Sequence, residues 1–264
     1  MKYHTLRMHP LVSRVGGAGA GALTLLVSGL IASAAEPIAQ KTGWDTSLTL
    51  GATLTRGNSK TFLGTGLLNT KRAWTNDEVL FGGSAGYGET TVVSGGNKID
   101  RITDSYIKGY GQWNHLLSAR TYAGLRVAAD HDDIASLAYR ATAGPMLGYY
   151  FVKQTNAFLA GEVGPSYVRE KFFHEPLHNY IGLRIAERGE RKFSSGAKMW
   201  ESLEWIPKVQ DLQNYLVTTE AGVSAPINKA LSVSLIAQDT YKSVPAANKL
   251  KNDLKLIAGL TYSF

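Results

Sequence analysis

The feature that most constrains this chain is a strict alternation of apolar and polar side chains along residues 44–55. Leu48 and Leu50 belong to the apolar series, and Thr49 between them belongs to the polar series. Successive side chains of a β-strand point to opposite faces, so a period of two with one apolar face predicts a half-buried strand. Residues 254–264 repeat the pattern. The sequence therefore predicts a fold built on β-strands.

Turn signals divide the chain between these two strands into further segments of roughly 10–16 residues. Eleven breaks separate twelve segments, and an even number suits a single-chain bacterial barrel with both termini on one side. The breaks lie at residues 56–59, 75–77, 94–97, 114–118, 130–136, 153–156, 173–177, 194–196, 207–213, 226–229 and 244–248. Segments 60–74 and 197–206 alternate less clearly, the second because Glu201 interrupts its apolar face, and a β-bulge would rephase them. We expect short turns at one rim and longer loops at the other.

A soluble β-sandwich alternates in the same way, so three further features decide between a soluble and a membrane-spanning fold. The segments are long enough to cross a bilayer at a tilt, whereas soluble strands average about 5–6 residues. The chain stops on Tyr262-Ser263-Phe264, with both aromatic rings on the apolar face. Other aromatic residues also gather near segment ends, as at membrane interfaces. They are Trp44, Trp74, Trp113, Tyr149, Tyr150 and Phe151.

These features predict an all-β fold, a transmembrane antiparallel β-barrel of about twelve strands over residues 44–264. The alternative is a soluble periplasmic β-protein, which would stay in solution without detergent.

The first 34 residues have the parts of a secretory signal peptide. A basic head without acidic residues precedes an apolar run over residues 18–31, and the run ends in Ala-Ser-Ala-Ala. This apolar run is too short for a membrane-spanning helix. We therefore expect a signal peptide over residues 1–34, export through the Sec pathway, and a lead-in segment over residues 35–43.

Composition excludes several classes of protein. The mean hydropathy of −0.12 is too low for a bundle of membrane-spanning helices. The absence of cysteine excludes disulfides, thiolate metal sites and a cysteine nucleophile, and in an exported chain it points to a bacterial envelope. The formal net charge of +7 includes three basic residues of the signal segment, so it does not imply a nucleic-acid partner.

Ionisable side chains on the polar faces of the strands are the first candidate functional residues. The alternation directs seven of them into the lumen, namely Lys108, Arg126, Arg140, Glu162, Arg184, Glu220 and Lys255. In an open pore this excess of basic residues would favour anions. In a plugged barrel the same charges would pair with one another, because buried charges must be partnered. We also expect Arg126 and Arg140 to lie nearly opposite each other on neighbouring strands, with Glu162 between them.

Catalytic and metal-binding residues are not expected. An outer-membrane lipid-modifying enzyme, the rival function, would need a serine or acid beside a histidine on the outer wall. The four histidines outside the signal segment lie at predicted turns or loop flanks, and none lies in the middle of a predicted strand beside a serine. They are His115, His131, His174 and His178. The acidic run Asp130-His131-Asp132-Asp133 has hard ligands but lacks the ligand spacing of a calcium loop, so we expect no metal and no cofactor.

Basic residues at one rim would face outer-membrane lipids and lipopolysaccharide if the first strand runs outward, because lipid phosphates offer counter-charges. They are Arg56, Lys60, Lys98, Arg101, Lys171, Lys249 and Lys251.

Several short motifs resemble a known family. They are Gly51 with Arg56-Gly57-Asn58-Ser59, then Ala138-Tyr139-Arg140, Gly148-Tyr149, and Glu162-Val163-Gly164-Pro165-Ser166-Tyr167 through Glu170. Over residues 43–264 the chain resembles the YdiY-like family of salt-induced outer-membrane β-barrel proteins. The resemblance implies an outer-membrane barrel, a passive pore or structural envelope protein with a link to salt or osmotic stress, and it carries no catalytic residues.

The chain end also resembles the terminal aromatic signal, here Tyr262 and Phe264, by which the outer-membrane barrel assembly machinery recognises its substrates.

Overall fold

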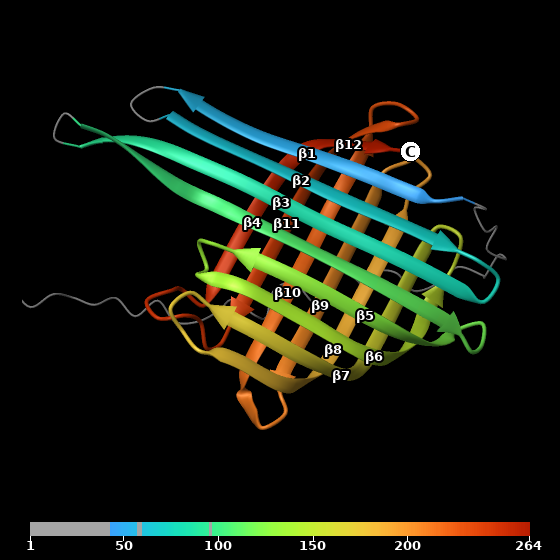
Figure 1. Ribbon diagram of the computed structural model, residues 1–264. Coiled ribbons are helices and arrows are strands. Elements are labelled where there is room, and N and C mark those ends of the chain that lie inside the picture. Colours follow the sequence, from blue (N-terminus) through green and yellow to red (C-terminus); the bar gives the residue numbers. More distant parts are fainter. Residues whose placement is uncertain (1–42, 57–59, 95–96) are drawn as a thin grey trace, which may run out of the picture. The chain divides into compact units, whose positions relative to one another are not determined.

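The computed structural model describes residues 43–56, 60–94 and 97–264 (Figure 1). The predicted signal peptide, most of the lead-in segment and the Gly57-Asn58-Ser59 turn lie outside the described residues. The twelve strands are β1 (Asp45–Arg56), β2 (Lys60–Ala73), β3 (Asp77–Ser94), β4 (Asn97–Leu116), β5 (Thr121–Asp132), β6 (Leu137–Lys153), β7 (Ala157–Phe172), β8 (Leu177–Lys192), β9 (Lys198–Lys208), β10 (Asp211–Pro226), β11 (Leu231–Lys242) and β12 (Asn252–Ser263). The prediction of about twelve antiparallel strands is confirmed.

Each strand pairs with the next one in sequence, and β1 pairs with β12, so the sheet closes into a barrel. The closing register runs from Ser47 opposite Ser263 to Gly51 opposite Gly259. The backbone N–H of Phe264 donates to the carbonyl of Thr46 at 2.9 Å and extends the seam to the last residue. Closure satisfies the backbone groups that a free sheet edge would expose.

The register of the two ambiguous segments shows no bulge. The pairs of β2 with both neighbours keep one register, as do the pairs of β9 with β8, and Glu201 faces outward; the register with β10 shifts only at the end of β9, opposite Asp211 to Tyr215. Register shifts occur elsewhere, for example between Gly88 and Glu89 on β3 and between Tyr150 and Val152 on β6. The less clear alternation of residues 197–206 reflects a polar residue on the outer face.

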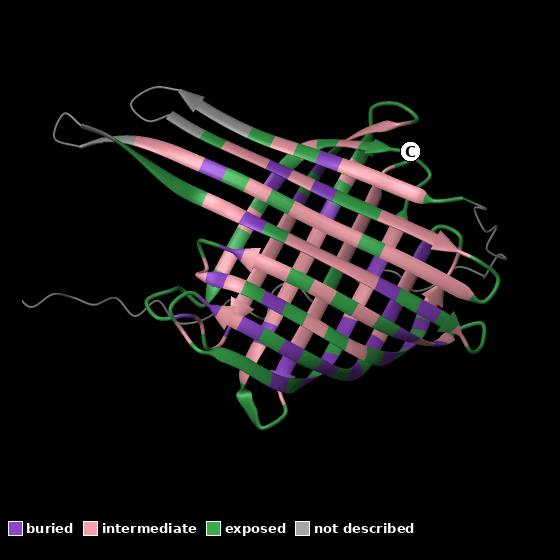
Figure 2. Ribbon diagram, viewed as in Figure 1, coloured by how far each residue is buried: buried purple, intermediate pink, exposed green. Residues whose placement is uncertain are grey.

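The two faces of the barrel have opposite chemistry. Outward-facing Leu50 and Leu256 are 60% and 69% exposed, whereas inward-facing Arg140 and Glu162 are only 5% and 4% exposed. Exposed and buried residues alternate along the strands (Figure 2). A soluble β-sandwich buries its apolar residues and exposes its charges. The reverse pattern here requires an apolar surrounding, as a lipid bilayer provides.

Aromatic side chains form a belt at one rim of the barrel, the rim where β1 begins and β12 ends. We call this the terminal rim and the opposite one the distal rim. Exposed aromatic residues at the terminal rim include Trp44, Trp74, Trp113, Tyr149, Phe151, Phe193, Tyr262 and Phe264. Tyr150 was predicted to belong to this belt, but its side chain points inward and is buried. In the part of the chain that the structure describes, no helix is long and apolar enough to span a bilayer.

The loops that the structure describes are of similar length at the two rims. This corrects the expectation of short turns at one rim and longer loops at the other. The exception is the segment between β11 and β12, residues 243–251, which we call the strap. Its Ala246 packs with Leu137 of β6 and Phe172 of β7. Its Ala247 N–H donates to the carboxylate of Glu175 in the β7–β8 loop at 3.1 Å. The strap therefore connects strands that are several positions apart around the distal rim.

Candidate functional site in the barrel interior

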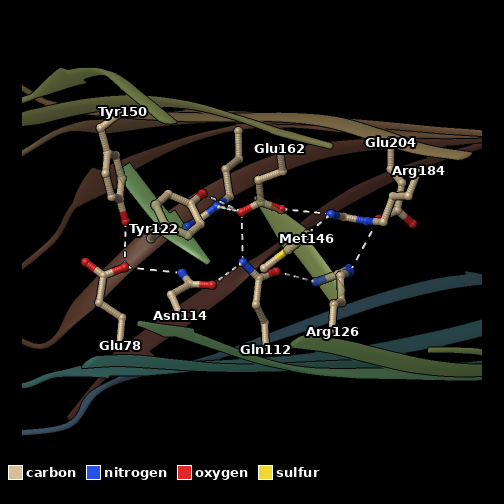
Figure 3. A network of polar contacts seen from close by, with 11 residues as sticks. Glu78, Gln112, Asn114, Tyr122, Arg126, Met146, Tyr150, Glu162, Arg184 and Glu204 are labelled. Carbon is tan, nitrogen blue, oxygen red and sulfur yellow. Dashed lines mark hydrogen bonds and ion pairs between the residues drawn. The ribbon is translucent and has the colours of Figure 1, made fainter. Parts of the chain in front are cut away.

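Glu162 on β7 is the centre of a polar network inside the barrel (Figure 3). One carboxylate oxygen accepts a hydrogen bond from Arg184 at 2.9 Å. The other accepts from Tyr122 at 2.7 Å, Gln112 at 2.8 Å and Arg188 at 3.1 Å. Small inward-facing residues such as Gly148 leave the room that the Tyr122 ring fills. Glu162 is thus buried, and both of its carboxylate oxygens accept hydrogen bonds.

Contacts between strands that are not neighbours must cross the interior, and this network contains several. Arg126 on β5 forms an ion pair with Glu204 on β9 at 3.3 Å, and Arg184 also bonds to Glu204. The hydroxyl of Tyr150 on β6 donates to Glu78 on β3 at 2.6 Å. The network, which we call the central network, therefore ties one wall of the barrel to the opposite one.

The central network compensates its own charge. It joins three carboxylates to three guanidinium groups through direct bonds and through the amides of Gln112 and Asn114. The charged members are Glu78, Glu162, Glu204, Arg126, Arg184 and Arg188. The expected excess of positive charge in the lumen is wrong at this level, because the acids that pair with the arginines were not all predicted to be interior.

A second network, the distal network, lies nearer the distal rim. Arg140 bonds to Glu170 at 2.9 Å and to Asp130 at 3.2 Å. Lys242 on β11 reaches Glu170 at 3.0 Å and also bonds to the hydroxyl of Tyr180. The charges of the two acidic and two basic side chains again balance, and this network lies beneath the strap.

The expected arrangement of Arg126 and Arg140 is wrong. Arg126 lies opposite Gly144 in the β5–β6 register, and Arg140 lies opposite Asp130. The two arginines therefore belong to different networks at different depths, and Glu162 does not lie between them. The error arises mainly because the β5–β6 loop covers residues 133–136 and is not centred near residue 133, and the register shift between Asp130 and Asp132 adds to it.

The other three residues predicted to face the lumen lie outside these networks. Lys255 on β12 bonds to Asp104 on β4 at 2.7 Å. Lys108 lies cross-strand from Asp130 and makes no ion pair within the described residues. Glu220 accepts hydrogen bonds from Trp200 and Gln238 instead of from a basic residue. Whether any of the seven residues sets ion selectivity stays a prediction.

The alternation pattern did not identify several interior charges, namely Glu78, Asp104, Asp130, Glu170, Arg188, Glu204 and Lys242. Arg188 and Glu170 share strand parity with Arg184 and Glu162, so the alternation could have found them. Glu204 lies in the segment whose alternation Glu201 hides, and Lys242 lies at the end of its strand. Their partners come from distant strands, which no local pattern specifies.

The histidines and the acidic run have structural contacts. His115 and His131 lie within strand ends instead of turns, and they contact Asp77 and Asp133 at 3.1 and 3.2 Å. Asp132 accepts a hydrogen bond from the backbone N–H of Ala135 at 2.9 Å. Within the described ranges, no group of three or more potential ligands is placed to hold a metal ion.

Closed strand pairing, an apolar outer face and a charged interior together define the class of this protein, a β-barrel of the outer-membrane type. A family model described as "Protein of unknown function, DUF481" matches residues 48–264. The chain therefore belongs to the DUF481 family.

Solved structures with a similar fold include barrels of different function. The translocator domain of the autotransporter NalP from Neisseria meningitidis is 11% identical, with 84% of this chain and 87% of that chain covered and a TM-score of 0.44. The NanC porin is 7% identical over 83% of this chain and 100% of that chain, with a TM-score of 0.48. The KdgM porin is 10% identical over 84% and 99%, with a TM-score of 0.39. These values are too low to carry a function to this chain, and no curated protein sequence matches it.

Proposed function

We propose that this protein is a narrow passive pore for small ions in the bacterial outer membrane. The observation that supports it is the uneven filling of the lumen. On one side, Tyr122 and Asn114 are completely buried in the central network. On the wall formed by β9, β10 and β11, inward-facing Ser202 is exposed, and Glu220 and Gln238 are only half-buried. Water therefore reaches polar side chains beside the network.

Partly exposed polar side chains next to a sealed half give a passage that is off-centre and small. Ions cross such a passage by exchanging water for polar groups of the wall, and solutes wider than a few water molecules are excluded. The central network narrows the passage, because its bonds join β5 to β9 and β3 to β6 across the interior.

Flux through proteoliposomes tests the proposal. Vesicles that contain the folded barrel should release K⁺ and Cl⁻ faster than empty vesicles and should retain a trisaccharide. Release of the trisaccharide at a similar rate would contradict a narrow pore. Retention of both ions by a correctly folded barrel would favour the second candidate, a structural envelope barrel, for which the charge-balanced central network is the supporting observation.

The proposed location rests on the apolar outer face, the aromatic belt and the signal-like residues 1–34. Outer-membrane lipids, with lipopolysaccharide on the outer side, are then the immediate partners. The assembly machinery is a further proposed partner, through Tyr262 and Phe264, whose rings contact each other at 4.8 Å on the outside of the seam. Deletion of Phe264 should reduce the membrane-inserted protein and leave secretion intact, and Phe264→Tyr should restore insertion. Equal insertion of the truncated chain would contradict this role.

The link to salt or osmotic stress stays a prediction from the family resemblance. Growth of a deletion strain at high salt, with complementation by the wild-type chain, would measure it.

A further inference from the structure

We infer that Glu220 makes the passage select small monovalent cations. The inference rests on the proposed pore and names its substrate class. It opposes the anion preference that the sequence predicts from the number of basic residues.

The Glu220 carboxylate is held in place but is not neutralised. One oxygen accepts a hydrogen bond from the indole N–H of Trp200 at 2.7 Å, and the other accepts from the amide of Gln238 at 2.7 Å. Both donors are uncharged. Glu220 makes no ion pair with a basic side chain anywhere in the described strands.

The other interior charges near this level each have a charged partner. The central network balances three carboxylates with three guanidinium groups, and Lys255, two strands along from Glu220, is bonded to Asp104. Lys198 lies 5.0 Å from the centre of the Trp200 ring, and it shares the Glu190 carboxylate with Lys192, at 3.7 and 3.6 Å. Lys108 is nearer the distal network, cross-strand from Asp130.

Glu220 also lies beside an inward-facing side chain that is exposed to solvent. Ser202 is its direct cross-strand partner on β9, and this inward-facing serine is exposed. Trp200 lies against Gly222 of β10, where any Cβ would overlap its ring. The glycine therefore leaves room for the indole, which also packs against the buried cluster of Leu67, Ile236 and Ile257 and is held beside Glu220.

The chemistry follows from Coulomb's law in a narrow space. A fixed carboxylate in a lumen with a lower dielectric constant than water attracts cations and repels anions more strongly than it would in bulk water. Its neutral donors fix both oxygens without cancelling the charge. A small cation such as K⁺ can exchange part of its hydration shell for these oxygens and leave again.

Reversal potentials in planar bilayers under a KCl gradient test the inference. The wild-type barrel should favour K⁺ over Cl⁻, and Glu220→Gln, which keeps the shape of the side chain, should lower that permeability ratio several-fold. The control is Glu201→Gln, because Glu201 is the adjacent acid on β9 and faces outward. The control should leave the ratio unchanged. An equal ratio in wild type and Glu220→Gln would overturn the inference.

Fluorescence quenching of Trp200 tests the cation site at Glu220 by a measurement that needs no current through the barrel. The Trp200 signal is the difference between the wild type and Trp200→Phe, and the quenchers are Cs⁺ and iodide. Glu220→Gln should decrease quenching by Cs⁺ and increase quenching by iodide, whereas Glu201→Gln should change neither. Unchanged quenching in Glu220→Gln would overturn the cation site. A barrel that passes no current but still shows these changes in quenching would overturn the proposed pore and support the cation site at Glu220.

Discussion

At Glu162, four side chains from three other strands donate hydrogen bonds to a single carboxylate. Two of them are arginines, so the charge and the geometry of the central network both depend on this residue. Charges removed from water are tolerated only when each is paired and hydrogen-bonded, and removal of one partner leaves the others uncompensated.

Glu162→Gln should therefore destabilise the barrel by about 3–5 kcal/mol, because Arg184 and Arg188 lose their shared counter-charge. In a conducting barrel the same change should shift the permeability ratio towards anions. The unfolding midpoint in denaturant, measured in one detergent for all variants, checks the first effect. Glu201→Gln on the outer face is the control and should change the stability by less than about 1 kcal/mol. A Glu162→Gln midpoint equal to wild type would contradict the compensating role.

The seam between β1 and β12 depends on close backbone approach. A Cβ on Gly259 would lie within 2.9 Å of the carbonyl carbon of Leu50 and 3.1 Å of the Gly51 Cα. Gly259→Ala should therefore weaken closure and lower the yield of folded barrel, measured by heat-modifiable migration on gels. Gly109→Ala on β4 is the matched control, because a Cβ there meets only an ordinary contact at 3.7 Å. Equal yields from the two variants would contradict the importance of the seam.

Among the elements, the strap is the part that differs most from a simple hairpin barrel. Eleven connections were predicted from turn residues, and those that the structure describes are short except for this one. It follows β11, and its apolar anchor packs on β6 and β7 above the distal network. The strap and the distal network thus narrow the same mouth of the barrel.

Ala246→Asp should release the strap, because a carboxylate cannot be buried against Leu137 and Phe172 without a partner. The expected result is a larger or more variable single-channel conductance. Val244→Asp in the same segment is the control, since Val244 is exposed and should tolerate the charge. A conductance unchanged by Ala246→Asp would show that the strap does not limit the passage.

On the scale of the whole molecule, local chemistry predicted the barrel but not its interior. Turn residues and alternation are properties of neighbouring residues, so the number and order of the strands follow from them. Which interior side chains meet depends on strand stagger and register, summed around twelve strands. For this reason the sequence did not predict that Arg126 pairs with Glu204, which lies four strands away.

The start of β1 and the end of β12 both lie at the terminal rim. We place this rim on the periplasmic side of the outer membrane, and this sets the orientation of the barrel. The strap residue Lys249 at the distal rim and Ser195 in the β8–β9 turn at the terminal rim are both exposed. Lys249→Cys should therefore react with an impermeant thiol reagent on whole cells, and Ser195→Cys should react only after the outer membrane is ruptured. The reverse labelling pattern would show that the terminal rim faces outward and would contradict this orientation.

Single-channel recording of the refolded wild-type barrel in a planar bilayer tests the central claim most directly. A narrow pore beside a sealed, charge-balanced network predicts discrete current steps of small amplitude that saturate as the KCl concentration rises and carry K⁺ in preference to Cl⁻. A barrel that is folded by heat-modifiable migration, is inserted in the bilayer and passes no current at any voltage would contradict the pore.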